Sequence, residues 1–207
     1  MTPIILEGRQ RTPEWHQAKC GVISGTRFAA AMAGRDTAAR ANLIADLAVE
    51  RVYGVAEDED RYVSPAMQHG IDIEDEAFAW YAFGTDEPVM QAMFVLHGAY
   101  SFIGVSPDLL VGGNGMAQVK CPERSAHVEL ICKRKLPSKY RWQVQGEMWV
   151  CGRGWSDFVS YHKVIGGEVL RVMRDDAAIK ELELACLRVH AEAEEVAAQL
   201  NQRRLAA

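Results

Sequence analysis

The cysteines of this sequence lack the pattern of a disulfide framework or a zinc site. The five cysteines, at positions 20, 121, 132, 151 and 186, are odd in number and scattered, and none forms a Cys-x-x-Cys pair. The six histidines are also dispersed, with no His-x-x-x-His pair. Such cysteines are typical of reduced thiols, so we expect a cytoplasmic protein and assign no cysteine or histidine to a metal.

Long apolar runs, repeats and linkers are also missing. No apolar run approaches the roughly 18 residues that a membrane span needs, so we expect no membrane partner. The stretch from Met1 to Glu7 has no basic segment followed by a long apolar one, so we expect no signal peptide. With 207 residues, 49% apolar and 25% charged, the sequence predicts one globular domain over residues 1–207.

An excess of positive charge is absent as well, since the formal net charge is -5. This argues against a general nucleic-acid coat protein, which would be basic. An acidic protein binds a polyanion only along a locally basic path. The sequence has one basic cluster, formed by Lys133, Arg134, Lys135, Lys139 and Arg141. It is interpreted either as such a path or as a solvated helix end.

Capping residues, prolines and apolar periodicity predict a mixed α/β protein. The expected helices run from Ser24 to about Gly34, from Thr37 to about Tyr53, from Ser64 to about Phe83, from Pro137 through Cys151, and from Asp175 to Arg204. The expected strands are 88–95, 102–105, 109–111, 116–120, 155–162 and 168–172. Helices followed by a small, mostly antiparallel sheet with an inserted helix indicate an α/β sandwich.

The most informative stretch is a predicted hairpin over residues 106–122. Its glycine-rich segment Gly112-Gly113-Asn114-Gly115 is a strong turn signal. Folding the chain between Gly113 and Asn114 aligns Asp108 with Val119, next to Gln118 and Lys120. Because Gln118 and Lys120 are two residues apart on a strand, both point to the same face. One acid, one amide and one lysine therefore converge at one end of a sheet.

This set of side chains suits a magnesium site, because Mg²⁺ takes oxygen ligands. Asp108, the side-chain oxygen of Gln118 and the carbonyl of Val119 are candidate ligands. Lys120 is a candidate to hold or deprotonate a water molecule and to neutralise charge on a phosphate. The alternative is an ordinary hairpin with a surface aspartate and lysine.

Glu74 is a further candidate, because it interrupts the apolar stripe of the helix expected after Ser64. Met67, Ile71, Phe78 and Tyr81 follow helical spacing, and Glu74 falls among them. A carboxylate at such a position is costly unless it is paired or binds a metal. The alternatives are an edge position that reaches water and a buried ion pair.

Five segments, in order along most of the chain, carry a family resemblance. They are residues 15–26, 70–77, 106–108, 119–122 and 143–150. With these segments the sequence resembles phage lambda exonuclease and the YqaJ-like viral recombinase family, within the PD-(D/E)XK nuclease superfamily. The resemblance implies a restriction-endonuclease-like core, in which helices flank a central mixed sheet.

The resemblance also implies an activity and partners. It implies a processive, Mg²⁺-dependent exonuclease, with Mn²⁺ as an expected substitute, that degrades one strand of duplex DNA in the 5′→3′ direction from 5′-phosphorylated ends. It further implies a ring-shaped homotrimer that works with a single-strand annealing protein in DNA recombination, in the cytoplasm of a bacterial or phage-infected cell. Neither assembly follows from residue patterns in this chain.

The resemblance assigns roles residue by residue. Asp108, position 118 and the Val119 carbonyl hold the metal, Lys120 serves the nucleophilic water, and Glu74 lies at the active site. The 5′-phosphate pocket maps onto Lys19, Thr26, Ser106 and Gln143, and the basic residues Lys133, Arg134 and Lys135 gain weight as DNA contacts. Position 19 is arginine in the lambda enzyme, so the lysine here keeps the charge but loses the bidentate fork. Thr26 replaces a serine and keeps the hydroxyl.

The chain departs from the family at Gln118, where the family has glutamate. Glutamine keeps an oxygen but loses the negative charge, and charge governs affinity for Mg²⁺. We therefore expect slower cleavage than in a Gln118→Glu variant, by on the order of a hundredfold if one electrostatic interaction of roughly 3 kcal/mol is missing from the transition state.

Three explanations of Gln118 compete. A deliberate substitution that traps uncut DNA is preferred, because every other site position looks competent. A naturally inactive DNA-end-binding module and a relocated acid, Glu74 or Glu147, are the alternatives. Another PD-(D/E)XK nuclease acting in DNA repair is the rival enzyme, although the cysteine spacing gives no support for the iron–sulfur cluster such enzymes often carry.

Overall fold

The computed structural model describes residues 2–55 and 65–206 of the chain. The expected helix cap Ser64 and the side chains of Met67 and Ile71 lie outside the described part. The helices are α1 (Pro13–Lys19), α2 (Phe28–Ala31), α3 (Ala38–Tyr53), α4 (Pro65–Gly84), α5 (Arg124–Lys133), α6 (Arg141–Cys151) and α7 (Asp176–Ala206), with 3-10 turns η1 (Gly25–Arg27) and η3 (Ser138–Tyr140). The strands are β1 (Ile4–Leu6), β2 (Val89–Met90), β3 (Phe94–Leu96), β4 (Gly104–Val105), β5 (Leu109–Val111), β6 (Gly115–Lys120), β7 (Trp155–His162) and β8 (Gly166–Met173).

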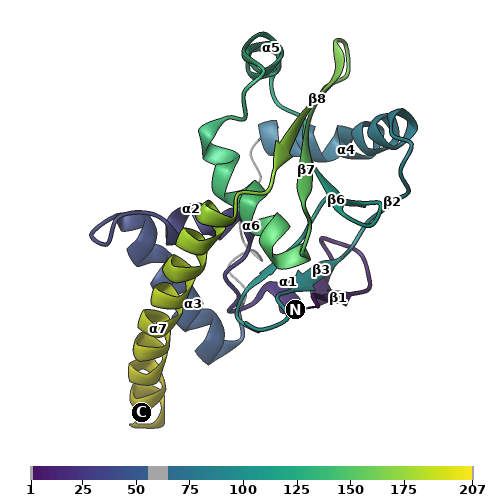
Figure 1. Ribbon diagram of the computed structural model, residues 1–207. Helices are drawn as coiled ribbons and strands as arrows, with labels where there is room; N and C mark the ends of the chain where they lie inside the picture. Colours follow the sequence, from purple (N-terminus) through teal and green to yellow (C-terminus); the bar gives the residue numbers. More distant parts are fainter. Residues whose placement is uncertain (1, 56–64, 207) are drawn as a thin grey trace.

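The strands form a mixed central sheet and a smaller antiparallel one. The central sheet has five strands in the order β2-β5-β6-β7-β8, and β6 and β7 run parallel while the other pairs are antiparallel. The smaller sheet has the order β1-β3-β4. The parallel pair requires a crossover, and α5, η3 and α6 supply it (Figure 1). The expected α/β class with a mixed sheet between helices is confirmed.

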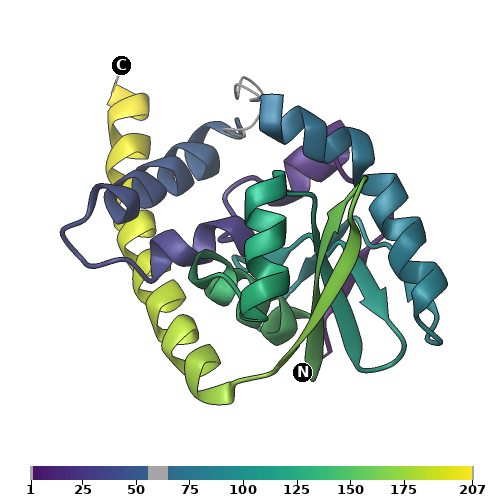
Figure 2. The ribbon, with the colours of Figure 1, turned by 90° about the horizontal axis from the view of Figure 1, so that it is seen from above.

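Helices cover both faces of the central sheet (Figure 2). On one face, α4 packs Ala77 and Tyr81 against apolar residues that include Ala117 and Val119 of β6. On the other face, α6 packs Val144 and Met148 in a cluster with strand residues that include Met116. Since successive strand residues point to opposite faces, Gln118 lies on the α6 side with Met116. Beyond α6, the long helix α7 runs beside α3.

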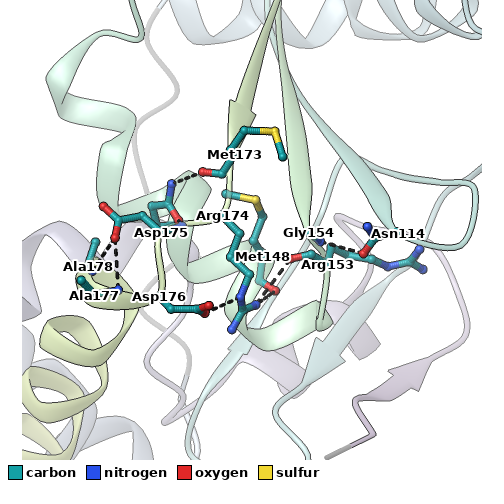
Figure 3. Close-up of polar contacts among 11 residues, drawn as sticks. Asn114, Met148, Arg153, Gly154, Met173, Arg174, Asp175, Asp176, Ala177 and Ala178 are labelled. Carbon is teal, nitrogen blue, oxygen red and sulfur yellow. Dashed lines mark hydrogen bonds and ion pairs between the residues drawn. The ribbon is translucent and has the colours of Figure 1, made fainter.

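Polar contacts fix the junction between β8 and α7 (Figure 3). The side chain of Asp175 caps α7 by accepting hydrogen bonds from the backbone N–H of Ala177 and Ala178 at 3.1 and 3.0 Å. Arg174 donates to the carbonyl of Met148 at 3.0 Å. These contacts tie the end of α6 to the sheet edge, and so hold α6 in place over the sheet.

Most predicted elements are present, with some corrections. A single strand over 88–95 is wrong, because β2 joins the central sheet whereas β3 joins the small one. Thr37 caps α3 through a hydrogen bond from the backbone N–H of Arg40, but Ser24 makes no such bond at η1. The sequence patterns do not predict α1 and α5, and in α5 only His127 and Leu130 are buried, which leaves little apolar periodicity to detect. No helix in the described ranges has the length and apolar character to span a membrane.

Candidate active site

The β5–β6 hairpin brings Asp108 and Gln118 together. Leu109 pairs with Ala117 and Val111 with Gly115, so continuing the register by one residue places Asp108 opposite Gln118. The expected alignment of Asp108 with Val119 is therefore wrong by one residue. The cause is a three-residue turn that Gly112 enters with a φ of +51°, a conformation that glycine adopts readily. Because residues directly opposite each other share a face, this register gives Asp108 the same face as Gln118 and Lys120.

Asp108 lies in a network of hydrogen bonds. Its Oδ2 accepts a bond from the side-chain amide of Gln118 and another, at 2.7 Å, from the backbone N–H of Val119. Gln118 is 1% exposed, so neighbouring residues must supply hydrogen-bond partners for both the nitrogen and the oxygen of its side-chain amide. Its Oε1 accepts a bond of 2.9 Å from Nε2 of Gln143.

Helix α6 adds a carboxylate that was not among the assigned site residues. The same Nε2 of Gln143 donates to Oε1 of Glu147 at 2.8 Å. Glu147 is 1% exposed, and its Oε2 is buried without a hydrogen-bond partner. Gln143 and Glu147 are four residues apart and share a helix face, which is the sequence signal that links Glu147 to an assigned site residue.

The charge of Asp108 acts on the two other acids of this region, Glu74 and Glu147. Burial, and then the nearby charge of Asp108, raises the pKa of Glu147 to about 8. The same two causes raise the pKa of Glu74, and burial raises that of Asp108, while Lys120 acts in the opposite direction on all three carboxyls. Burial together with like charge disfavours ionisation, and the positive charge of a nearby cation would favour it.

The N-terminal region contributes residues to the same site. Arg11 forms an ion pair with Oε2 of Glu74 at 2.6 Å. The indole N–H of Trp15 donates to Oγ of Ser106 at 2.6 Å, and the Nζ of Lys19 lies 3.9 Å from the Trp15 ring centroid. Sequence reasoning missed Arg11 and Trp15, because no local pattern predicts which distant segment the N-terminal region will contact.

One open cleft of about 770 Å³ is lined by all the residues predicted for catalysis, metal binding and the 5′-phosphate pocket. Its lining includes the predicted residues Lys19, Thr26, Glu74, Ser106, Asp108, Gln118, Val119, Lys120 and Gln143, and also Glu147. Cationic and carboxylate side chains thus face a common space. A cleft with this lining can place an anionic substrate beside a carboxylate cluster.

Of the basic cluster, Lys139 lines this cleft, whereas Lys133, Arg134 and Lys135 do not. Lys133 pairs with Glu129 at 2.5 Å, and Arg134 pairs with Glu168 at 2.7 Å. Lys133 and Lys135 line a second cavity of about 460 Å³. Lys120, Lys139 and Tyr140 line both spaces, so the second cavity adjoins the cleft.

The donors in the cleft fit a hard divalent cation. Asp108 and Glu147 supply carboxylates, Gln118 supplies an amide oxygen, and the buried Oε2 of Glu147 has no other partner. Mg²⁺ and Mn²⁺ accept such oxygen ligands. Within the part of the chain that the structure describes, no three side chains of His, Cys, Asp or Glu are grouped to hold a metal. A cation here would therefore also depend on amide, backbone or water oxygens.

Comparisons with known proteins identify relatives of this chain. The family of the YqaJ-like viral recombinase domain matches residues 14–154. An alkaline exonuclease (LHK-Exo) from Laribacter hongkongensis is 33% identical, with a TM-score of 0.85, and the match covers 94% of this chain and 98% of that one. The structure of LHK-Exo in complex with dAMP matches with a TM-score of 0.86 at the same identity and coverage.

A more distant structure supports the fold alone. A phage-related exonuclease from Haemophilus somnus 129PT is 11% identical, with a TM-score of 0.67 over 86% of this chain and 96% of that one. The comparison with curated proteins gives no match. The expected restriction-endonuclease-like core is confirmed by the likeness to the alkaline exonuclease. Through the domain match over residues 14–154, the chain belongs to the YqaJ-like viral recombinase family.

Proposed function

We propose that this protein is a Mg²⁺-dependent exonuclease that degrades one strand of duplex DNA, 5′→3′, from 5′-phosphorylated ends. The observation that carries the proposal is the shared cleft, in which Asp108, Gln118 and Lys120 face Lys19 and the other predicted phosphate-binding residues. Membership of a viral recombinase family, and likeness to an alkaline exonuclease, support a nuclease that serves recombination.

In this proposal, the hairpin carries the hydrolytic residues. Asp108, Gln118 and the Val119 carbonyl would hold Mg²⁺, which when bound supplies Lewis acidity at the scissile phosphate. Lys120, partly buried in the same cleft, orients the attacking water and offsets negative charge on the phosphate in the transition state. Glu74 lies beside them, with its carboxylate oriented by Arg11.

The 5′-phosphate pocket would form in the same cleft. Lys19 brings a positive charge, while Thr26 and Ser106 bring hydroxyl groups. The indole N–H of Trp15 orients the Ser106 hydroxyl, because it occupies one lone pair of that oxygen. Anchoring the terminal phosphate there would set how far the next phosphodiester reaches toward Lys120, and so would release nucleotides one at a time.

Polarity and end preference are tested together. Linear duplexes labelled at the 5′ or the 3′ terminus, with and without a 5′-phosphate, are digested with this protein in Mg²⁺. The proposal predicts early release of the 5′ label as mononucleotide and faster degradation of phosphorylated ends. Release of the 3′ label first, or cleavage within closed circular DNA, would contradict it.

We also propose that the protein forms a homotrimer and works with a single-strand annealing protein. A ring-shaped homotrimer would let the enzyme stay on one duplex, and a single-strand annealing protein would receive the strand that remains. Light scattering measures the first, with a mass three times that of the 23.0 kDa chain expected. Co-purification with an annealing protein expressed beside it measures the second.

The rate of this chain depends on the charge around Gln118. The inactivating-substitution hypothesis predicts slow cleavage, and the naturally inactive end-binding module predicts none. The relocated-acid hypothesis predicts ordinary cleavage. The surroundings of Glu147 favour the relocated acid over the other two, because the buried Oε2 of this residue has no hydrogen-bond partner.

A further inference from the structure

We infer that Glu147 of α6 supplies the second carboxylate of the divalent-cation site, replacing the charge that the chain lacks at position 118. This inference rests on the proposed function for its chemistry, and it deepens that function by assigning a ligand. It removes the reason to regard Gln118 as an inactivating change.

The topology places Glu147 on the correct side of the sheet. Met116 packs in the same cluster as Val144 and Met148 of α6. Gln118 lies two residues further along the strand, so its side chain points toward α6 as well. A carboxylate missing from this strand position can therefore be replaced from α6 with little displacement. Glu74 lies on α4, which covers the opposite face of the sheet.

A single nitrogen connects the two positions. Nε2 of Gln143 donates to Oε1 of Gln118 at 2.9 Å and to Oε1 of Glu147 at 2.8 Å. The two acceptor oxygens thus lie within one hydrogen-bond length of the same atom. Gln118 in turn donates to Oδ2 of Asp108. Hydrogen bonds through the side-chain amides of Gln143 and Gln118 thus link the carboxylates of Glu147 and Asp108 along the cleft.

Glu147 differs from the other buried carboxylates of the described chain. Glu50, 3% exposed, accepts bonds from Arg27 and from the backbone N–H of Gly21. Asp157, also 3% exposed, accepts from Arg171 and Tyr81. Glu147 has no ion pair among the described residues, and its Oε2 has no partner. An unpartnered buried carboxylate is costly, and carboxylates of this kind coordinate metals or are otherwise paired.

A glycine, Gly25, leaves room for the side chain of Glu147. A Cβ on Gly25 would lie 3.0 Å from Oε1 of Glu147, closer than an ordinary contact. Gly25 begins the η1 turn, next to the predicted phosphate-binding residue Thr26. The small residue at position 25 therefore leaves room for this carboxylate beside the predicted 5′-phosphate pocket.

Glu74 is the weaker candidate for the relocated acid. Its Oε2 is engaged by Arg11 at 2.6 Å, and its side chain is 25% exposed. A carboxylate already neutralised by an arginine adds less net charge to a cation site than one without a cationic partner.

The test is a charge swap that preserves side-chain volume. Mg²⁺ binding without DNA is measured by calorimetry for the wild type, Glu147→Gln, Gln118→Glu, and the Gln118→Glu/Glu147→Gln double variant. We expect Glu147→Gln to weaken Mg²⁺ binding by on the order of tenfold or more, and the double variant to restore it to within a few-fold. Glu74→Gln is the matched control, with a smaller effect.

Several results would overturn the inference. The first is that Glu147→Gln binds Mg²⁺ with the same affinity as the wild type. The second is that a folded double variant does not regain Mg²⁺ affinity. The third is that the wild type does not bind Mg²⁺. Circular dichroism confirms folding, and rescue by the double variant guards against a misfolded single variant. Digestion of duplex DNA by the same proteins separates the two proposals. If Mg²⁺ binding changes with the charge swap but no protein cleaves DNA, only the proposed function is contradicted. If Mg²⁺-dependent cleavage occurs but Glu147→Gln changes neither cleavage nor Mg²⁺ binding, only this inference is contradicted.

Discussion

Asp108 accepts a hydrogen bond from the side-chain amide of Gln118, the residue that lies opposite it across the β5–β6 hairpin. A glutamate at position 118 would present a second negative charge to Asp108 in place of this donor. Without a bound cation the two carboxylates would repel each other, and one of them would tend to keep a proton. The glutamine thus stabilises the end of the hairpin. In our inference, the second negative charge of the cation site comes from Glu147 on α6.

Lys19 is predicted to carry the preference for 5′-phosphorylated ends. A Lys19→Met variant loses this positive charge from the cleft, so the ratio of kcat/KM for phosphorylated over hydroxyl ends should fall by about tenfold, the effect of one charged hydrogen bond. Lys163→Met, an exposed residue in the β7–β8 turn, is the matched control and should keep the ratio. An unchanged ratio in Lys19→Met would remove Lys19 from the phosphate pocket.

The basic cluster should contribute through charge rather than by touching the reacting phosphate. Changing Lys133, Lys135 and Lys139 to glutamine should make the plot of log Kd against log salt concentration shallower, by about 0.9 for each phosphate that the protein no longer neutralises. Lys133 and Arg134 should contribute less than Lys135 and Lys139, because Glu129 and Glu168 partly neutralise them. Fluorescence anisotropy of a labelled duplex measures the slope. A slope equal to the wild type would return the cluster to the solvated-surface interpretation.

The local features of the site were predictable from the sequence, whereas its distant partners were not. Strand alternation sufficed to put Gln118 and Lys120 on one face, and the glycine-rich turn sufficed to bring Asp108 near them. The register was wrong by one residue, because the sequence does not fix how many residues a Gly-Gly-Asn-Gly turn uses. The structure has three, with Gly112 at positive φ.

Contacts between segments far apart in the chain required the structure. Nothing local in the sequence places Arg11 beside Glu74 or Trp15 beside Ser106, since these pairs depend on how the N-terminal segment packs against α4 and the hairpin. Helix α5 was missed because only two of its residues are buried. The family resemblance supplied the roles of Lys19 and Thr26, which residue patterns alone do not give.

The buried ion pair between Glu50 and Arg27 is predicted to hold the phosphate-binding segment in place. Glu50 joins α3 to the backbone N–H of Gly21 at 2.7 Å and to Arg27 at 2.8 Å, on either side of residues 22–26. Glu50→Gln leaves the guanidinium without its counter-charge, so the free energy of unfolding should fall by about 3 kcal/mol. Urea denaturation measures this decrease. A decrease below about 1 kcal/mol would mean that water or neighbouring groups replace the interactions of the Glu50 carboxylate with little loss of stability.

His127 should make the protein less stable in acid. Burial lowers the pKa of this imidazole below its ordinary value of 6.5, so below that pH the unfolded chain binds the proton more tightly than the folded one. The free energy of unfolding should therefore fall as the pH drops below about 6.5 and stop changing on this account below the folded-state pKa. Denaturation at several pH values should give a smaller slope for His127→Gln. An identical slope would exclude His127 as a source of the acid sensitivity.

The most direct test of the account compares duplex digestion by the wild type with that by Asp108→Asn and Lys120→Met, all in Mg²⁺ and at saturating protein. Both side chains face the cleft with Gln118, and they are proposed to act on the metal and on the water. Each variant should bind the labelled 5′-phosphorylated duplex within a few-fold of the wild type, while the single-turnover rate should fall by on the order of a thousandfold. Cleavage by either variant at the wild-type rate would contradict the account.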